Sequence, residues 1–173
     1  MRAFLAIPLP DGLRSPVAEA QQDLRGAGTD VSWIAEDALH LTLKFLGEIP
    51  GDARPDFRPP PPFDLELAGV GEFAGRIVWA GCRGDLSAVK ETAARAEDAG
   101  ERLGVPRERR PFSPHVTIGR IRSRRHLGKL RERMKGWADR VFGPWPVRRI
   151  VLFRSELSPR GAVYTEVAEY PCA

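Results

Sequence analysis

The stretch Leu39-His-Leu-Thr-Leu-Lys-Phe-Leu46 alternates apolar and polar residues at first and then becomes mainly apolar, which is typical of a strand that ends near Gly47. A second stretch, His115-Val-Thr-Ile118, repeats its central pattern. Residues i and i+2 of a strand lie on the same face, so each histidine is expected beside the threonine two positions later. The two stretches therefore predict two half-buried strands, each with one imidazole and one hydroxyl on its polar face.

The rest of the chain predicts strands and helices in a mixed order. Strands are expected over residues 2–8, 63–70, 76–80, 115–121, 147–156 and 162–169, and helices over 11–26, 86–103 and 124–138. Asp11 is expected to cap the first helix and Gly26 to end it. Strands 63–70 and 76–80 are joined too tightly for a helical crossover, so an α+β protein of two similar halves is favoured over a doubly wound parallel sheet.

Residues 50–62 are rich in proline and include the run Pro59 to Pro62. Regular structure is not expected there, and the segment is interpreted as a surface linker or stiff loop. The length of 173 residues is typical of one domain that buries its own core. We therefore expect residues 1–173 to form a single domain.

Positive charge is concentrated in one part of the sequence, although the formal net charge is only +4. Between residues 107 and 135, only Glu108 and Glu132 oppose the basic side chains, which are Arg107, Arg109, Arg110, Arg120, Arg122, Arg124, Arg125, Lys129, Arg131, Arg133 and Lys135. Such a local excess attracts phosphates and makes their binding dependent on salt. A solvated charged face is the alternative interpretation.

The sequence favours a soluble, cytoplasmic protein. Cys82 and Cys172 lack the dense spacing of a secreted disulfide framework, and two thiols in a reducing compartment are expected. The apolar run at the N-terminus is short and is interrupted by Pro8 and Pro10, so it predicts a buried strand rather than a signal peptide. No segment approaches the roughly 20 apolar residues that span a bilayer.

The paired histidines indicate acid and base catalysis. Hydrolysis of a cyclic phosphodiester needs a base that takes a proton from water and an acid that protonates the departing alkoxide. Histidine, with a pKa of about 6.5, can fill either role near neutral pH. If the two strands line one cleft, His40 and His115 would carry the protons, and Thr42 and Thr117 would donate hydrogen bonds to the phosphate oxygens.

A metal site is the other common use of paired histidines. Catalytic zinc usually takes three protein ligands, and neither histidine has a further histidine, cysteine or carboxylate at the spacing of known zinc motifs. The third histidine, His126, lies in a basic segment and is expected at the surface. No metal is therefore expected.

These residues resemble the two-histidine phosphoesterase superfamily, and specifically its branch of bacterial and archaeal RNA 2′,3′-cyclic phosphodiesterases, historically called 2′-5′ RNA ligases. The resemblance covers nearly the whole chain. Beyond the histidine motifs it rests on Arg2-Ala-Phe-Leu-Ala-Ile-Pro-Leu9, Lys44-Phe-Leu-Gly-Glu48, Ile77-Val-Trp-Ala-Gly81 and Arg110-Pro-Phe-Ser-Pro-His115. It implies a bilobal fold, with an antiparallel sheet and outer helices in each lobe and the active cleft between the lobes.

The resemblance also implies residue roles. His40 would be the acid that protonates the leaving 3′ oxygen, and His115 the base that activates water, so the product would be a 2′-phosphomonoester. Thr42 and Thr117 would hold the phosphate, and Arg120 matches an arginine that contacts it. In a regular strand Arg120 would face away from His115, so either the strand bends near Gly119 or the side chain reaches around its end. No cofactor is implied.

Several alternatives remain open on the sequence. Phe45 and Phe112 are candidates to stack on a terminal base, and core positions are the competing interpretation. The same groups could join a cyclic phosphate end to a 5′ hydroxyl through a 2′-5′ linkage. A noncatalytic RNA-binding module and a phosphodiesterase of small cyclic nucleotides are further possibilities. The expected partner is an RNA with a 2′,3′-cyclic phosphate end; no obligatory protein partner is expected, and the chain is expected to act as a monomer.

Overall fold

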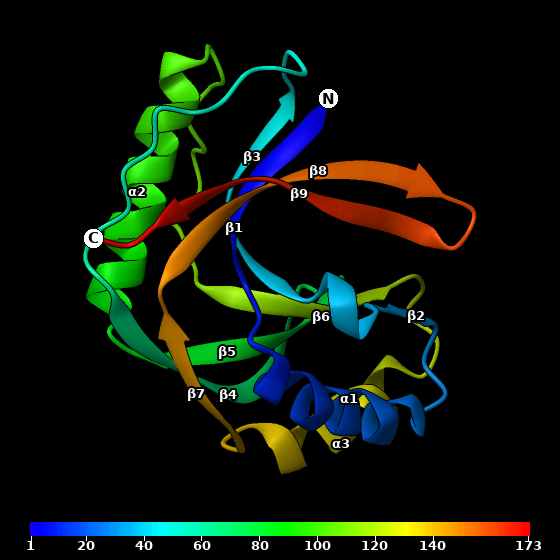
Figure 1. Cartoon of the computed structure of the whole chain (residues 1–173). Helices are drawn as coiled ribbons and strands as arrows, with labels where there is room; N and C mark the ends of the chain where they lie inside the picture. The colour runs from blue at the N-terminus through cyan, green and yellow to red at the C-terminus, as the bar shows by residue number, and fades with distance from the viewer.

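Two antiparallel sheets form the framework of the protein, and the computed structural model describes residues 1–173 (Figure 1). The first sheet has four strands in the order β3-β1-β8-β9. Their bounds are β1 (Arg2–Pro8), β3 (His40–Glu48), β8 (Arg149–Ser158) and β9 (Gly161–Pro171). The two final strands form a long hairpin that extends from the sheet.

The second sheet has five strands in the order β2-β6-β5-β4-β7. Their bounds are β2 (Val31–Trp33), β4 (Phe63–Phe73), β5 (Ile77–Gly84), β6 (His115–Ile121) and β7 (Val141–Val147). Strands β3 and β6, which carry the histidine motifs, lie in different sheets and contact each other. The two motifs are thus brought together by the packing of the sheets and not by strand pairing.

The helices cross from one sheet to the other. Helix α1 (Asp11–Arg25) follows β1 of the first sheet and leads to β2 of the second, and it packs against β6 and β7 of the second sheet. Helix α2 (Leu86–Arg102) connects two strands of the second sheet but packs against β3 of the first. Helix α3 (Leu127–Met134) packs against α1 beneath the second sheet (Figure 1). Two 3-10 turns, η1 (Glu36–Ala38) and η2 (Lys135–Trp137), complete the structure. None of the helices has the length and apolar character needed to cross a membrane.

A contiguous core of 35 buried residues runs through both sheets. Helix α1 shows how the sequence builds it, because its apolar positions recur every three or four residues and all of them are buried: Leu13, Val17, Ala20 and Leu24. Full burial of one large aliphatic side chain contributes about 1.5–3 kcal/mol. This shared core fixes the two sheets relative to each other and therefore fixes the distance between β3 and β6.

The predicted elements are confirmed in most places, with three corrections. Asp11 does not cap α1: Pro10 is the N-cap residue, Asp11 is the first helical residue, and its carboxylate pairs with Arg14 at 3.4 Å. Gly26 is the C-cap residue as predicted. Strands β2 and β7 were not predicted. β2 has only three residues, and β7 contains two prolines, which its edge position tolerates.

Residues 50–62 have no regular structure, as predicted, but they are not a free linker. Phe57 is only 4% exposed and stacks edge-on against Tyr170 at a centroid distance of 5.4 Å. Arg95 of α2 donates a hydrogen bond to the carbonyl of Arg58 at 3.1 Å. The segment is therefore a strap bound along α2, because a buried aromatic side chain and hydrogen bonds to its carbonyls hold it in place.

Candidate active site

His40 is the first residue of β3 and is held by two hydrogen bonds. Its Nδ1–H donates to the carbonyl oxygen of Ala38 at 2.7 Å, and Nε2 lies 3.0 Å from the hydroxyl oxygen of Thr42. With the proton on Nδ1, the lone pair of Nε2 accepts the Thr42 O–H. The predicted neighbourhood of His40 and Thr42 is confirmed, and the backbone fixes which ring nitrogen is free to exchange a proton.

His115 is held in the same way at the start of β6. Its Nδ1–H donates to the carbonyl oxygen of Ser113 at 2.7 Å. In both histidines the acceptor is therefore the carbonyl two residues earlier in the chain. Each ring keeps Nε2 for other partners, so the two motifs present equivalent nitrogen atoms from opposite sheets.

The surroundings of the two rings differ. His40 lies against Phe4, with ring centroids 4.8 Å apart, and against the edge of Tyr164 at 5.2 Å. His115 has one aromatic neighbour, Phe73, at 5.1 Å. The pKa of His40 is lowered to about 4, mainly by burial, with a smaller contribution from the positive charges of Arg120 and His115 and against the opposing effect of the Ala38 hydrogen bond. At neutral pH the His40 ring of the free protein is therefore uncharged.

This lowered pKa predicts a pH-dependent stability. Because the folded protein disfavours protonated His40, the contribution of His40 is fully present above pH 6.5 and is lost as the pH falls from 6.5 to about 4. The loss from this one group should be about 3 kcal/mol of the free energy of unfolding. Urea unfolding at pH 6.5 and pH 4 should show that the His40→Gln variant loses less stability than the parent protein. Equal losses in the two proteins would contradict the buried, uncharged state of His40.

The two threonines line the same region with different partners. The Thr42 hydroxyl bonds to Nε2 of His40, whereas the Thr117 hydroxyl has no hydrogen-bond partner within the protein. Thr117 is partly exposed and pairs with Trp79 of β5 across the sheet. A free hydroxyl beside a histidine is available to donate to a bound anion.

A β-bulge brings Arg120 to the face of His115. Along β6, Val78 pairs with Gly119 but the next residue of β5, Trp79, pairs with Thr117, so Ile118 is an extra residue. The extra residue reverses the alternation of the strand. Arg120 is consequently exposed on the side of His115 and Thr117, and its charge acts on His40. Of the two expected explanations, the bend near Gly119 is the one that the structure has.

Strand β3 has a bulge at the equivalent place. Leu5 of β1 pairs with Lys44 and the following Ala6 pairs with Thr42, so Leu43 is extra. Phe45, five residues after His40 as Arg120 is five residues after His115, is 65% exposed and lies 6.1 Å from the ring of Phe4. It is therefore available to a ligand.

Phe112 differs from Phe45 because it is half-buried. It lies in the loop before β6 and packs against the hydrophobic core. This position fits the core interpretation better than a role in stacking on a base. Phe45 is therefore the stronger of the two aromatic candidates.

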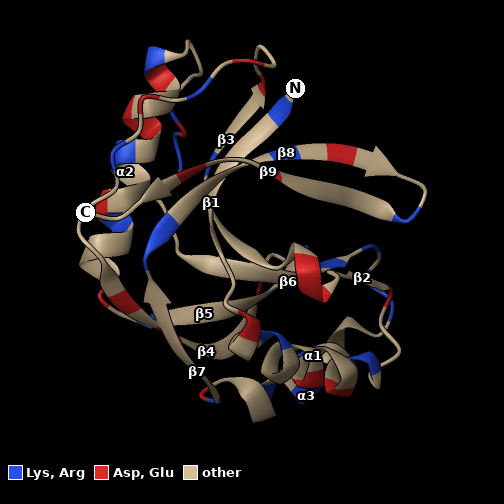
Figure 2. Ribbon diagram, viewed as in Figure 1, with Lys and Arg blue, Asp and Glu red and all other residues tan.

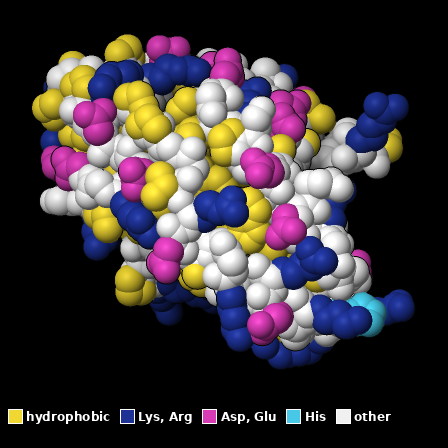
Figure 3. Space-filling model, turned by 90° about the horizontal axis from the view of Figure 1, so that it is seen from below, with side chains coloured by type: hydrophobic (Ala, Val, Ile, Leu, Met, Phe, Trp, Pro, Cys, Tyr) yellow, Lys and Arg dark blue, Asp and Glu magenta, His cyan; other side chains and the backbone are white.

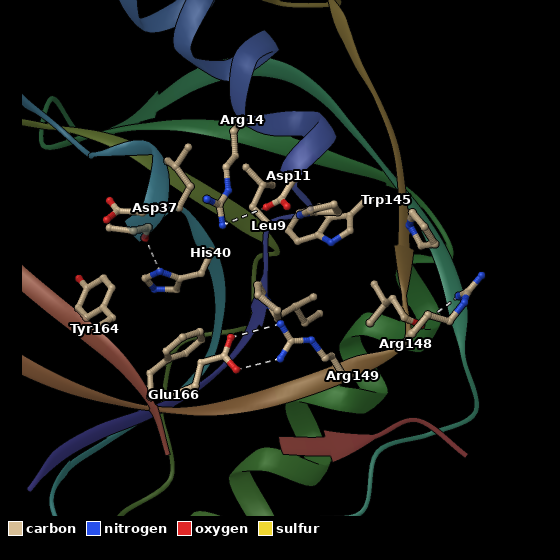
Figure 4. Close-up of a pocket in the computed structure, with 18 residues that line it drawn as sticks. Leu9, Asp11, Arg14, Asp37, His40, Trp145, Arg148, Arg149, Tyr164 and Glu166 are labelled. Atoms are coloured by element: carbon tan, nitrogen blue, oxygen red, sulfur yellow. Dashed lines mark hydrogen bonds and ion pairs between the residues drawn. The ribbon is translucent and has the colours of Figure 1, made fainter. Parts of the chain in front are cut away.

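A cavity of about 370 Å³ opens beside His40 (Figure 4). It is bounded by the turn from β1 to α1, by η1, by the corner between β7 and β8, and by β9. Arg149 pairs with Glu166 at 3.1 Å on the wall opposite the Asp11–Arg14 pair. His115 is not among the residues that line this cavity, so it extends the site on the His40 side only.

The donor set offers no third metal ligand. The structure contains no group of three or more histidine, cysteine, aspartate or glutamate side chains placed to hold a metal ion. The third histidine, His126, is exposed as predicted and lies outside the site.

Comparison with known proteins identifies the family. Residues 9–159 match the family model described as the 2′-5′ RNA ligase superfamily. The chain belongs to this superfamily. Two curated relatives of the chain are each named RNA 2′,3′-cyclic phosphodiesterase. The relative from Methanothermobacter thermautotrophicus is 31% identical over 96% of each chain, and the one from Thermus thermophilus is 34% identical over 98% of this chain and 89% of its own.

Solved structures confirm the fold expected for this superfamily. The protein TT0787 of Thermus thermophilus superposes with a TM-score of 0.78 at 30% identity, and the match covers 99% of this chain and 97% of that one. Escherichia coli LigT in its apo form also has a TM-score of 0.78, at 25% identity, and the match covers 99% and 96% of the two chains. The predicted α+β architecture of two lobes, each with an antiparallel sheet, is therefore confirmed.

Some residues of this site were missed because they are distant in the sequence. Tyr164 and Phe153 belong to the hairpin of β8 and β9, and each lies within 6.2 Å of His40 by ring centroids. Phe73, at the end of β4, approaches His115. The aromatic residues carry no local motif, so only the pairing of β8 with β1 and of β5 with β6 brings them to the histidines.

Proposed function

We propose that this protein hydrolyses RNA-terminal 2′,3′-cyclic phosphates to 2′-phosphomonoesters by acid and base catalysis at His40 and His115, without a metal. The observation that carries the proposal is the matched pair of rings, each with Nδ1–H bound to a backbone carbonyl at 2.7 Å. The names of the curated relatives support cyclic phosphodiester hydrolysis, and support RNA as the substrate.

In the proposed reaction His115 is the base. Its Nε2 accepts a proton from water while the water oxygen forms a bond to phosphorus. The bond from phosphorus to the 3′ oxygen breaks, and Nε2–H of His40 gives its proton to that oxygen. The atoms balance as cyclic phosphate plus water giving a 2′-phosphate and a 3′ hydroxyl, and the two histidines end with their protonation states exchanged.

His40 can act as the acid only after it has gained a proton. Its pKa of about 4 makes the charged ring a minor species in the free protein at neutral pH. A phosphate anion beside Nε2 favours the charged ring and raises this pKa. The substrate itself would thereby help to charge the acid that cleaves it, and the assignment of the acid role to His40 follows the resemblance to the two-histidine phosphoesterases.

The remaining site residues would bind the phosphate. Thr117 has a free hydroxyl, Thr42 bonds to the reacting nitrogen of His40, and Arg120 is exposed without a carboxylate partner. Hydrogen-bond donors aimed at the non-bridging oxygens stabilise the charge that accumulates there in the transition state. Phe45 is proposed to contact the terminal base. Phe112, which is half-buried, would contribute to the wall of the site behind the terminal base.

We further propose that residues 1–173 act as a single domain and as a monomer in the cytoplasm. The shared core and the helices that cross between the sheets support one unit. Cys82 and Cys172 are free thiols, which suits a reducing compartment.

The test is to incubate the protein, with EDTA present, with a short RNA that ends in a 2′,3′-cyclic phosphate. Phosphorus NMR should then show a 2′-phosphate as the product. A 3′-phosphate would contradict the proposed leaving group, and inhibition by EDTA would contradict metal-free catalysis. If the RNA stayed unchanged but cyclic mononucleotides were hydrolysed, the protein would be a phosphodiesterase of small substrates. If neither substrate were hydrolysed, an RNA-binding module would be favoured. Adding an RNA with a 5′ hydroxyl would reveal any 2′-5′ joining.

A further inference from the structure

The basic segment from 107 to 135 divides into paired and unpaired side chains. Four residues are neutralised by carboxylates: Arg107 by Asp98 and Glu101, Arg131 by Glu72, Arg133 by Asp23, and Lys135 by Glu132. The other seven, none of which has a carboxylate within 4.0 Å, are Arg109, Arg110, Arg120, Arg122, Arg124, Arg125 and Lys129. The positive charge of these seven residues is therefore not balanced by a neighbouring carboxylate.

Three of these seven residues, Arg122, Arg124 and Arg125, directly follow the end of β6, and Arg76 lies beside that strand end. We call Arg76, Arg122, Arg124 and Arg125 the exit strip. Arg122 continues the backbone pairing of β6 beyond its last residue, since its N–H donates to the carbonyl of Asp30 at 2.7 Å, and its side chain donates to the neutral Ser32 hydroxyl at 2.9 Å. Arg76 is attached to the same strand end, because its carbonyl accepts the N–H of Ile121. All four arginines of the strip are exposed.

The exit strip is continuous with the catalytic face. Arg120 lies on the face of His115 because of the bulge at Ile118, and Arg122 follows two residues later along the extended chain. Alternate residues of such a chain are about 6.6–6.8 Å apart. Figure 2 shows basic residues where β6 ends beside β2, and in Figure 3 Lys and Arg side chains crowd the lower part of the face seen from below.

Aromatic surface accompanies the strip. Phe73 is 38% exposed and lies edge-on to His115, and Arg76 follows it in the turn between β4 and β5. A basic surface beside an exposed aromatic ring suits single-stranded nucleic acid, because the charges follow the backbone and the ring can stack on a base of any identity.

The opposite approach to the site is less suited to a polyanion. Arg109 and Arg110 also lack ion pairs, but the carboxylate of Glu108 accepts hydrogen bonds from both of their backbone N–H groups, at 3.0 and 3.2 Å. A negative charge is therefore fixed inside that loop. No acidic residue interrupts the sequence from Arg120 to Arg125.

We infer that the exit strip binds the phosphates of the RNA strand on the 5′ side of the terminal cyclic phosphate. The inference rests on the proposed function and adds to it a preference for polynucleotide ends over cyclic mononucleotides. A cyclic mononucleotide bound at His40 and His115 has no further phosphate on its 5′ side to place on the strip. A longer strand gains a contact for each phosphate that the strip neutralises, so its capture depends on salt.

The test compares two substrates and two charge-matched variants. The substrates are an RNA of ten nucleotides with a 2′,3′-cyclic phosphate end and a cyclic mononucleotide with the same terminal base. Arg122→Gln/Arg124→Gln removes two charges from the strip, and Arg109→Gln/Arg110→Gln removes two from the same segment at the other approach. Arg125 is left in place because its Nε–H bonds to His126.

The strip variant should lose about 10- to 100-fold in kcat/KM on the RNA at low salt and keep its kcat/KM on the mononucleotide. For this variant, the slope of log kcat/KM on the RNA against the logarithm of the salt concentration should be shallower by about 1.4. Each lost phosphate contact to a single strand reduces this slope by about 0.7. The matched variant should change little on either substrate. Equal losses on both substrates, no loss on the RNA, or a larger loss in the Arg109/Arg110 variant would overturn the inference.

Failure of the proposed function would be recognised separately. If the parent protein opened neither cyclic phosphate, fluorescence anisotropy with a labelled RNA of ten nucleotides would still measure the strip. Weaker RNA binding by the strip variant, with unchanged binding by the matched variant, would support the surface even then. Equal binding by all three proteins would reject it.

Discussion

His115→Asn is expected to slow the hydrolysis of RNA-terminal cyclic phosphates by about 10³-fold, within the range of general acid or base catalysis. The Asn side chain keeps a group that can donate to the Ser113 carbonyl but cannot accept a proton from water. His40→Asn is expected to cause a similar loss, since the leaving oxygen would depart without a proton. The measurement is kcat/KM on an RNA with a cyclic phosphate end, with circular dichroism to show that each variant is folded.

The third histidine supplies the matched control. His126 is exposed and bonds through Nε2 to the neighbouring Arg125, outside the candidate site. His126→Asn should therefore retain the activity of the parent protein. Because the two catalytic histidines act in one reaction, the double variant should lose less than the product of the two single losses. Activity within about tenfold of the parent in either catalytic variant would contradict general acid and base catalysis by that residue.

The second large effect is expected at the threonines. Thr117→Val keeps the shape of the side chain and removes a hydroxyl that has no partner within the protein, so kcat should fall by about 10²-fold with little change in stability. Thr42→Val removes a hydroxyl that also bonds to His40 at 3.0 Å, so it should both lower kcat and raise the pKa at which His40 titrates. Steady-state kinetics and NMR titration of the histidine ring protons measure the two effects.

Thr165 provides the comparison for both threonine variants. It is exposed on β9, and Tyr164, which faces His40, is its neighbour, so the alternation of the strand directs Thr165 away from the site. Thr165→Val should leave kcat unchanged. If Thr117→Val did the same, the proposed contact of its hydroxyl with the phosphate would be wrong.

The sequence was sufficient for the features that depend on local pattern. The alternation around His40 and His115 predicted both strands and the faces of Thr42 and Thr117, because side-chain direction in a strand follows from residue parity. The position of Arg120 could not be predicted in this way. It depends on a bulge in the pairing of β6 with β5, which is a property of two strands together.

The unpredicted elements have similar physical reasons. β2 is a three-residue edge strand whose place depends on Gly119: a Cβ there would lie 2.8 Å from Cγ1 of Val31 and 2.9 Å from the ring of Trp33. No periodicity can emerge from three residues. Phe57 of the strap is buried although prolines surround it. Its burial could not be predicted, because its partner Tyr170 lies more than a hundred residues away in the sequence. Such contacts are decided by tertiary packing.

The assignment of acid and base is the central claim, and replacing the 3′ oxygen of the cyclic substrate by sulfur tests it most directly. A thiolate leaves without a proton, since the pKa of a thiol is about 8.5. Measured with EDTA present, His40→Asn should recover activity to within about tenfold of the parent protein on this substrate, whereas His115→Asn should remain about 10³-fold slower because water still needs its base. Recovery of His115→Asn but not of His40→Asn would show that the two roles are reversed, and recovery of neither would contradict acid catalysis of the leaving group.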